Sequence, residues 1–260
     1  MKIANWNINS VRIRLDHLKT LANQHAPDII CLQELKCQTE AFPYEELAEL
    51  NYNLYVHGQK SGNGVAIFSK KVADEVINNF AGNPIPDQAR YIEICLNTTL
   101  GYCRIICLYA PNGGEVDSDK YKIKLDFYDA LINHLQKIRL LDEQIVICGD
   151  FNIAPFDLDV YKPEMLRNNT CFTAIEQKKL RTILNLGLVD NYRIVNPFKS
   201  EFSWWDYRAG AFEQNKGYRI DAIISSSGLA NNLKDCFIDY ETRGKPKASD
   251  HAPIIAIYEP

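Results

Sequence analysis

Residues 145–152 read Ile145-Val-Ile-Cys-Gly149-Asp150-Phe151-Asn152, an apolar run that ends in an acid and an amide two positions apart. Four apolar residues before a glycine predict a buried β-strand. Because side chains alternate along an extended chain, Asp150 and Asn152 would share one side while Phe151 packs on the other. An acid to orient a water and an amide to bind a phosphoryl oxygen suit phosphodiester cleavage. A turn stabilised by its own Asp and Asn side chains is the alternative interpretation.

Seven further apolar runs predict strands, and segments with helical spacing lie between some of them. The strands are expected at 4–8, 29–32, 65–68, 91–96, 105–109, 220–224 and 254–258, and the helices at 15–22, at 127–138 and before a stop at Gly187. Ser10 is the expected cap of the first helix. The pattern indicates an α/β fold with some strands antiparallel. A chain of 260 residues without repeats or linkers favours one domain, residues 1–260.

Polar residues stand at the ends of six of these strands, after four of them and before the other two. The six clusters are Asn7 with Asn9, Gln33 with Glu34, Tyr109 with Asn112, Asp150 with Asn152, Arg219 with Asp221, and Ser249 with Asp250 and His251. If the last two strands run antiparallel to the first four, all six clusters lie on one rim of the sheets. That rim is where a site is expected.

Each cluster also has an ordinary interpretation when it is taken alone. The three asparagines of residues 5–9 share one face of a strand, which could be a solvated face. Glu34, after its buried strand, suits a hard cation or a helix cap. His251 could stabilise charge on a phosphate with Asp221 as its partner, or it could be an ordinary hydrogen-bonded histidine.

Composition indicates the cellular compartment of the protein more clearly than its chemistry. A net charge of −4 gives no support for nucleic-acid binding, so any cationic footprint for DNA must be local. The eight cysteines show no CxxC pair or zinc spacing, and we expect buried thiols in a reducing compartment. No leader-like segment follows Met1, and no apolar stretch approaches the roughly 20 residues of a membrane span. We expect a cytoplasmic protein that does not bind membranes.

Eight motifs run along nearly the whole chain: Asn5-Trp-Asn-Ile-Asn-Ser-Val-Arg12, Asp28-Ile-Ile-Cys-Leu-Gln-Glu-Leu-Lys36, Gly64-Val-Ala-Ile67, Leu108-Tyr-Ala-Pro-Asn112, Gly149-Asp-Phe-Asn152, Phe202-Ser-Trp-Trp-Asp-Tyr-Arg208, Arg219-Ile-Asp221 and Ser249-Asp-His-Ala-Pro253. In this order they resemble the exonuclease III family of AP endonucleases, within the endonuclease/exonuclease/phosphatase superfamily. The resemblance implies a four-layer α/β/β/α sandwich of two packed mixed β-sheets flanked by helices. It also implies a site where the rims of the two sheets meet.

The resemblance implies a magnesium site on this rim. Glu34 would be the principal ligand of Mg²⁺, with Mn²⁺ as a possible substitute, and retained waters would complete the shell because magnesium dehydrates reluctantly. Asn7 would either assist the ion or hold a phosphoryl oxygen. The implied metal ligands besides Glu34 are Asn7, Asp150, Asn152, Asp250 and His251.

Catalytic roles follow from the same resemblance. Asp150 would orient and deprotonate the attacking water, and Asn152 would hold a phosphoryl oxygen. His251, paired with Asp221, would stabilise charge on the phosphate. Tyr109 would lie against the phosphate or the leaving oxygen. The implied reaction is in-line attack by water with metal assistance.

An aromatic segment, residues 202–218, bears on the substrate. In the resembled family this region, at Trp204 and Tyr218, makes a narrow apolar pocket for an extrahelical sugar without a base. Flipping costs least where pairing is already lost, and a tight pocket would exclude a nucleotide that keeps its base. Of Trp204 and Trp205, we expect one to line the pocket and one to pack in the core.

Contacts to the DNA backbone are expected from residues that flank the matched motifs, namely Arg90, Asn112 and Lys247. Weaker candidates are Lys60, Lys120, Lys122, Lys124, Arg243 and Lys245. Such surface charges are often only solvated.

The resemblance thus implies a monomeric base-excision repair enzyme that cleaves duplex DNA 5′ to abasic sites by Mg²⁺-dependent hydrolysis. Activity as a 3′→5′ exodeoxyribonuclease and in cleaning 3′ ends is expected at the same site. Two alternatives stay open. Another phosphodiesterase of the superfamily would act on RNA, lipid or inositol phosphate, and the aromatic segment argues against it. A DNA-binding module without catalysis would have no need of the complete polar set.

Overall fold

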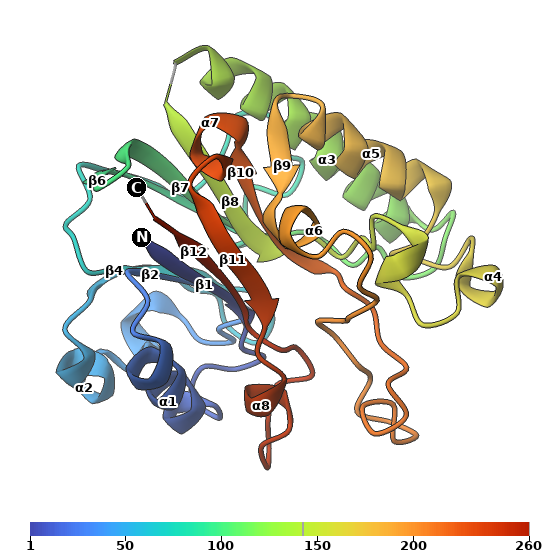
Figure 1. The fold of residues 1–260 in the computed structure, drawn as a ribbon, viewed down its shortest axis with the longest axis horizontal. Helices are drawn as coiled ribbons and strands as arrows, with labels where there is room; N and C mark the ends of the chain where they lie inside the picture. Colours follow the sequence, from blue (N-terminus) through green and yellow to red (C-terminus); the bar gives the residue numbers. More distant parts are fainter. Residues whose placement is uncertain (142, 260) are drawn as a thin grey trace.

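Two six-stranded sheets pack face to face in the computed structural model, which describes residues 1–141 and 143–259 (Figure 1). In spatial order the first sheet consists of β11 (Leu233–Ile238), β12 (Ile254–Tyr258), β1 (Lys2–Asn7), β2 (Ile29–Gln33), β4 (Val65–Ser69) and β3 (Asn53–His57). The second consists of β5 (Glu75–Ile77), β6 (Tyr91–Thr98), β7 (Gly101–Tyr109), β8 (Gln144–Asp150), β10 (Asp221–Ser226) and β9 (Leu188–Asp190). Both sheets mix parallel and antiparallel pairs.

Helices cover the outer face of each sheet. Helices α1 (Leu15–His25) and α2 (Tyr44–Leu47) lie on the first sheet, and α3 (Asp119–Ile138) and α5 (Ala174–Leu184) lie on the second (Figure 1). Connecting segments carry the short helices α4 (Pro163–Leu166), α6 (Asn191–Val195), α7 (Ser227–Ala230) and α8 (Tyr240–Arg243), and the 3₁₀ turns Thr39–Ala41, Ala48–Leu50, Arg139–Leu141 and Asp157–Asp159. The predicted four-layer α/β/β/α sandwich is confirmed.

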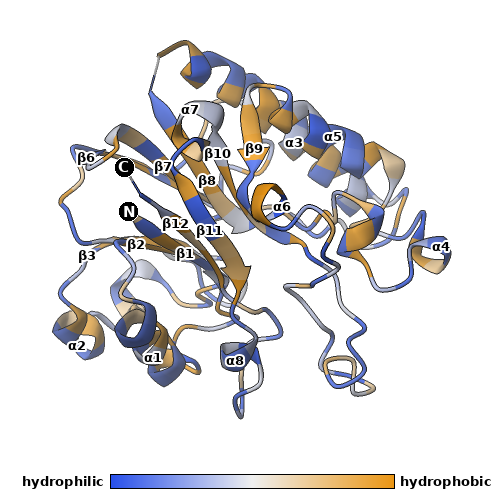
Figure 2. Ribbon diagram, viewed as in Figure 1, coloured by the Kyte–Doolittle hydropathy of each residue, from blue (hydrophilic) through white to orange (hydrophobic). Residues whose placement is uncertain are grey.

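Alternation along the strands creates the apolar layers of the sandwich. On β1, Ile3 packs between the two sheets, whereas Ala4 and Trp6 pack toward α1. On the other side, Phe127 and Leu131 of α3 pack on the second sheet. Figure 2 shows hydrophobic and hydrophilic residues intermixed along α3 and α5, as expected of helices that cover one side of a sheet. Each large side chain buried in this way contributes about 1.5–3 kcal/mol.

The strand directions place the polar strand ends together, as predicted. β1 runs parallel to β2 and β7 parallel to β8, whereas β12 and β10 run antiparallel to β1 and β8. The register aligns Tyr109 with Asp150, and Asp150 with Asp221, in one row across the second sheet. The rim of this sheet therefore presents three of the predicted catalytic side chains side by side.

The predicted cap of the first helix is wrong. Helix α1 begins at Leu15 after Arg14, and Ser10 has a φ of 85°. The Ser10 N–H donates to the carbonyl oxygen of Glu34 at 2.7 Å. This pairing with the segment after β2 takes the serine out of the helix start, so tertiary contacts override the local capping preference.

All eight cysteines lie in the described ranges and are buried free thiols. Across residues 1–141 and 143–259, no helix combines the length and the apolar character that crossing a membrane would require.

Candidate active site

A cleft of about 570 Å³ opens on the rim where the two sheets meet. Polar residues from both sheets line it together with part of the aromatic segment. The lining residues that the sequence predicted are Glu34, Tyr109, Asn112, Asp150, Asn152, Trp204, Tyr218, Asp250 and His251. Residues from across the chain therefore converge on one cavity.

Asn7 joins the two sheets next to the cleft: it is not among the lining residues, but it contacts Glu34 and Asp150, which are. Its side-chain amide donates to Glu34 Oε1 at 3.0 Å and to Asp150 Oδ2 at 2.9 Å. Asn5, two positions earlier, donates to the carbonyl oxygen of Gly149 at 3.2 Å. Both asparagines are buried between the sheets. The alternative of a solvated face is therefore wrong for Asn5 and Asn7.

Glu34 lies just beyond β2, with a φ of 53°, and no helix begins at it, so the helix-cap alternative is also wrong. Its Oε1 accepts the hydroxyl of Tyr109 at 2.8 Å, and its Oε2 lies 3.0 Å from the ammonium of Lys36. Burial favours the protonated acid, but the hydrogen bond from Asn7 and the charges of His251 and Lys36 prevail and lower the pKa of Glu34. Glu34 is thus held as a carboxylate.

Asp150 is almost fully buried at the end of β8. Burial and the nearby carboxylate of Asp221 raise its pKa to about 7, although the charge of His251 opposes the rise. Its Oδ1 accepts the main-chain N–H of Asn152 at 2.9 Å, which closes an Asx turn. Asp150 can therefore close this turn and still line the cleft, since the turn orients its carboxylate.

His251 and Asp221 form the predicted pair. The Nδ1 atom of His251 lies 2.8 Å from Asp221 Oδ2, and its Nε2 lies 3.8 Å from Asp150 Oδ2. Burial alone would lower the pKa of His251, but the two carboxylates raise it to about 10. The ring is therefore a cation at neutral pH and faces Asp150.

Sequence reasoning missed Ser203, which orients this pair. Its hydroxyl donates to Asp221 Oδ2 at 2.6 Å and accepts the main-chain N–H groups of Ile220 and Asp221 at 3.1 Å each. Ser203 is fully buried. A lone serine between Phe202 and two tryptophans was the available signal, because a buried hydroxyl needs a polar partner.

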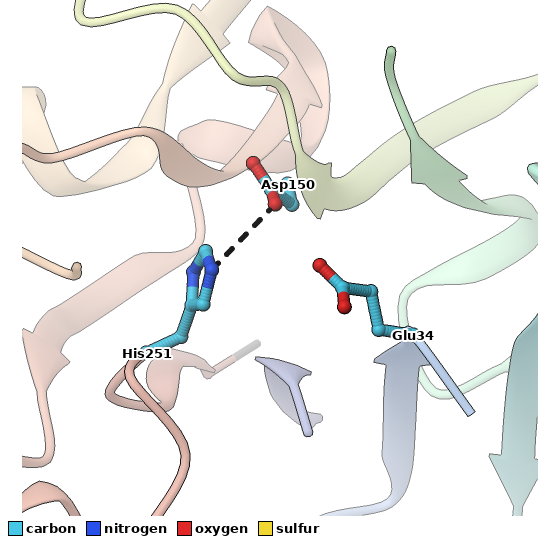
Figure 3. A group of neighbouring side chains, drawn as sticks. All are labelled: Glu34, Asp150 and His251. Carbon is cyan, nitrogen blue, oxygen red and sulfur yellow. Dashed lines mark ion pairs between the residues drawn. The ribbon is translucent and has the colours of Figure 1, made fainter. Parts of the chain in front are cut away.

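A cation could bind between Glu34, Asp150 and His251 (Figure 3), since one ligand atom from each lies within 4.8 Å of the others. Two carboxylates at a solvent-accessible cleft suit a hard cation such as Mg²⁺, which favours oxygen ligands and keeps some of its waters. A protonated imidazole has no lone pair to offer a metal. The two roles predicted for His251, as ligand and as phosphate-facing cation, therefore exclude each other at any one time.

The other predicted metal ligands already have partners inside the protein. Asn152 donates from Nδ2 to the carbonyl oxygen of Ala110 at 2.9 Å and accepts at Oδ1 from Asn112 at 3.1 Å. Asp250 accepts from Asn9 at 2.8 Å and from the indole N–H of Trp204 at 2.9 Å. Both still line the cleft, beside Glu34 and Asp150.

Trp204 and Tyr218 form one wall of the cleft. Their rings meet edge to face at 5.7 Å, and the ring of Tyr161 packs on Tyr218 at 6.3 Å. Trp205 is fully buried, with Phe212 against its ring. One tryptophan thus lines the cleft and the other packs in the core, as predicted.

The residues predicted to contact DNA differ in exposure. Asn112 and Lys247 are exposed, whereas Arg90 is partly buried with its guanidinium 4.6 Å above the ring of Tyr109. Two weaker candidates are excluded by burial. Lys124 has no exposed side-chain area, and Arg243 is buried against the rings of Phe212 and two other aromatic residues.

Comparison with known proteins agrees with this geometry. A model of the "Endonuclease/Exonuclease/phosphatase family" matches residues 4–251. Exodeoxyribonuclease III of Haemophilus influenzae is 36% identical over 267 residues, which cover 100% of both chains. The fold and the site define a phosphodiesterase of this class.

Two solved structures narrow the class. A 3′ phosphatase from Neisseria bound to a product DNA hairpin has a TM-score of 0.95 at 36% identity, covering 100% of this chain and 99% of the other. An AP endonuclease from Archaeoglobus fulgidus has a TM-score of 0.94 at 35% identity, with 100% of both chains covered. The chain belongs to the exonuclease III family of AP endonucleases and is a phosphodiesterase of that type.

Proposed function

We propose that this protein is a DNA repair nuclease that cleaves duplex DNA 5′ to abasic sites, and that the same cleft trims or cleans 3′ ends. The observation that carries the proposal is the aromatic wall of Trp204 and Tyr218, which faces the cleft beside Asp150 and His251. A flipped sugar without a base would lie against this wall. Its phosphate would reach the polar rim.

We further propose that Glu34 and Asp150 hold Mg²⁺, with Asn7 and Asp250 at the edge of the same site. When bound, the ion would neutralise charge on the phosphate and on the leaving oxygen. His251 would remain protonated and face the phosphate, because Asp221 holds its other ring nitrogen. This assigns His251 to the substrate rather than to the metal.

The remaining steps use groups of the chain itself. Asp150, with its pKa raised to about 7, would accept a proton from the attacking water. Asn152 has one side-chain N–H besides the one bonded to Ala110, and this N–H would donate to a phosphoryl oxygen in the transition state. Asn7 would donate to a phosphoryl oxygen by releasing Glu34 or Asp150, which accept its two N–H groups in the free enzyme. Burial and two carboxylates raise the pKa of Tyr109, so its hydroxyl stays a donor close to the leaving oxygen. Arg90, Asn112 and Lys247 would bind neighbouring phosphates.

Incubation with a duplex that carries one abasic-site analogue tests the proposal directly. We expect a single nick 5′ to the lesion that leaves a 3′-hydroxyl when Mg²⁺ is present, and no nick with a chelator. A duplex with an intact base at that position is the control and should survive. Cleavage of RNA or of inositol phosphates in preference to the abasic duplex would favour the superfamily alternative and contradict the proposal.

The pH dependence of kcat/KM should be bell-shaped. Asp150 must be ionised to accept a proton, so activity rises as pH passes its pKa of about 7. His251 must stay protonated, so activity falls as pH passes about 10. Bound Mg²⁺ would stabilise the carboxylate form, so the acid limb should move to lower pH as magnesium is raised. Profiles at two magnesium concentrations measure this shift of the acid limb. If the acid limb did not move with magnesium concentration, the group that titrates would not be a ligand of the ion.

A further inference from the structure

Lys124 is a fully buried charge that the chemistry above does not use. It lies on α3, and its ammonium donates to the main-chain oxygens of Asn112 at 3.0 Å and Asn152 at 2.7 Å, and to the carboxylate of Glu176. All three ammonium protons therefore have acceptors. Two of these acceptors belong to the loops that follow β7 and β8, and both loops reach the cleft.

Glu176 extends this connection to a third segment. It is also fully buried, on α5, and its Oε1 accepts the N–H of Cys171 at 3.0 Å. Its Oε2 accepts the N–H and the hydroxyl of Thr173 at 2.9 Å each. Cys171 lines the cleft. The ion pair of Lys124 and Glu176 thus joins three cleft-forming segments at one point behind the site.

The hydrogen bond from Lys124 to the carbonyl oxygen of Asn152 affects the position of the reacting groups. Asn152 has a φ of 50°, a left-handed conformation that a residue with a side chain keeps only with support from its surroundings. Its N–H orients Asp150 Oδ1, and its side-chain amide is held by Asn112. Because Lys124 holds the carbonyl oxygen of the same residue, a shift there would turn both the amide and the carboxylate.

We infer that Lys124 and Glu176 are positioning residues for the hydrolysis, acting through Asn152 and Asp150. Stability alone does not account for the pair, because burying each ion costs several kcal/mol and apolar replacements are often neutral or stabilising. The lysine stem packs closely against Gly113, where a φ of 95° also favours glycine. A Cβ there would lie 2.9 Å from Lys124 Cδ. The inference rests on the proposed function for the reaction that is positioned.

The double variant Lys124→Met/Glu176→Gln tests this inference. It removes both buried charges together, so no unpaired ion destabilises the fold, while methionine keeps the length of the lysine stem. We expect kcat to fall by about ten- to a hundredfold, the usual result of misplacing a catalytic group by about 1 Å, with DNA affinity near that of wild type. Single-turnover cleavage, DNA titration and thermal unfolding give the three quantities.

Two matched controls separate positioning from general damage. Lys137→Met changes an exposed lysine in the last turn of the same helix and should leave kcat unchanged. Arg104→Met breaks the buried pair with Glu93, in the first half of β7 and five residues before Tyr109. It should lower the unfolding temperature while kcat per folded molecule is retained.

A double variant that folds and keeps the wild-type kcat would overturn the inference, and so would an Arg104→Met enzyme that loses as much kcat. A double variant that does not fold would assign the pair to folding and equally overturn it. Rates are compared with wild type on the abasic duplex and on plain 3′ ends. A wild-type enzyme active only at 3′ ends would contradict the proposed function, while the ratio of variant to wild type would still test the pair.

Discussion

Asp150→Asn is expected to lower kcat by about a thousandfold or more while the enzyme still binds DNA, because a positioned general base contributes roughly 10²–10⁴ to the rate. Asparagine keeps the shape of the side chain and can still accept the N–H of Asn152, but it cannot take a proton from water. It also relieves the repulsion between the carboxylates of Asp150 and Asp221. Single-turnover cleavage of the abasic duplex and a DNA titration measure the two effects.

The control for this variant is Asp206→Asn, which changes another acid of the same cleft. Asp206 pairs with the exposed Arg208. Within residues 1–141 and 143–259, it forms no hydrogen bond with Asp150. Its kcat should stay near that of wild type. If Asp150→Asn kept more than about a tenth of the wild-type rate, Asp150 could not be the essential base.

Sequence periodicity predicted the interior strands of both sheets and missed the edge strands. Among residues 1–141 and 143–259, all eight predicted strands are interior, and the four missed strands, β3, β5, β9 and β11, are the edges of the two sheets. Interior strands covered on both faces are nearly continuous apolar runs. Edge strands such as β11, which alternates partly exposed and buried residues, keep polar side chains, and β5 and β9 have only three residues each. An apolar run cannot reveal such strands.

The site was predictable to the extent that it consists of strand ends. Glu34, Asp150 and His251 each follow or precede an apolar run, and Asn7 and Tyr109 lie near the end of one. Their convergence therefore needed only the strand directions. The residues that support these side chains do not lie at strand ends and could not be predicted in this way. Ser203 acts through hydrogen bonds that depend on the packing of three distant segments.

Lys124 shows how a local pattern can mislead. The alternating lysines at 120, 122 and 124 suggested a basic surface, but helical spacing places Lys124 with Tyr121, Phe127 and Leu131 on the buried face of α3. Helical spacing therefore predicts that Lys124 is buried. A buried charge needs a partner, so a lysine on this apolar face also predicts a buried acid beside it.

Glu34→Ala is expected to lower the cleavage rate at limiting magnesium by about three orders of magnitude, because a metal supplies several kcal/mol of charge stabilisation and each 1.36 kcal/mol is tenfold in rate. High magnesium should restore part of the rate, since Asp150 would still offer an oxygen ligand. Loss of the acceptor for the Tyr109 hydroxyl should cost about 1–3 kcal/mol of stability. Calorimetric titration with Mg²⁺ would measure the loss of binding independently of activity.

Glu40→Ala is the matched control for Glu34→Ala, because it removes an exposed acid six positions further along the same segment after β2. Its magnesium titration should coincide with that of wild type. For Glu34→Ala, the half-saturating magnesium concentration must rise in both the calorimetric and the kinetic titration. If both titrations stayed unchanged, the ion would not bind at Glu34, and Asp150 with Asp250 would become the candidate ligands, since both line the same cleft.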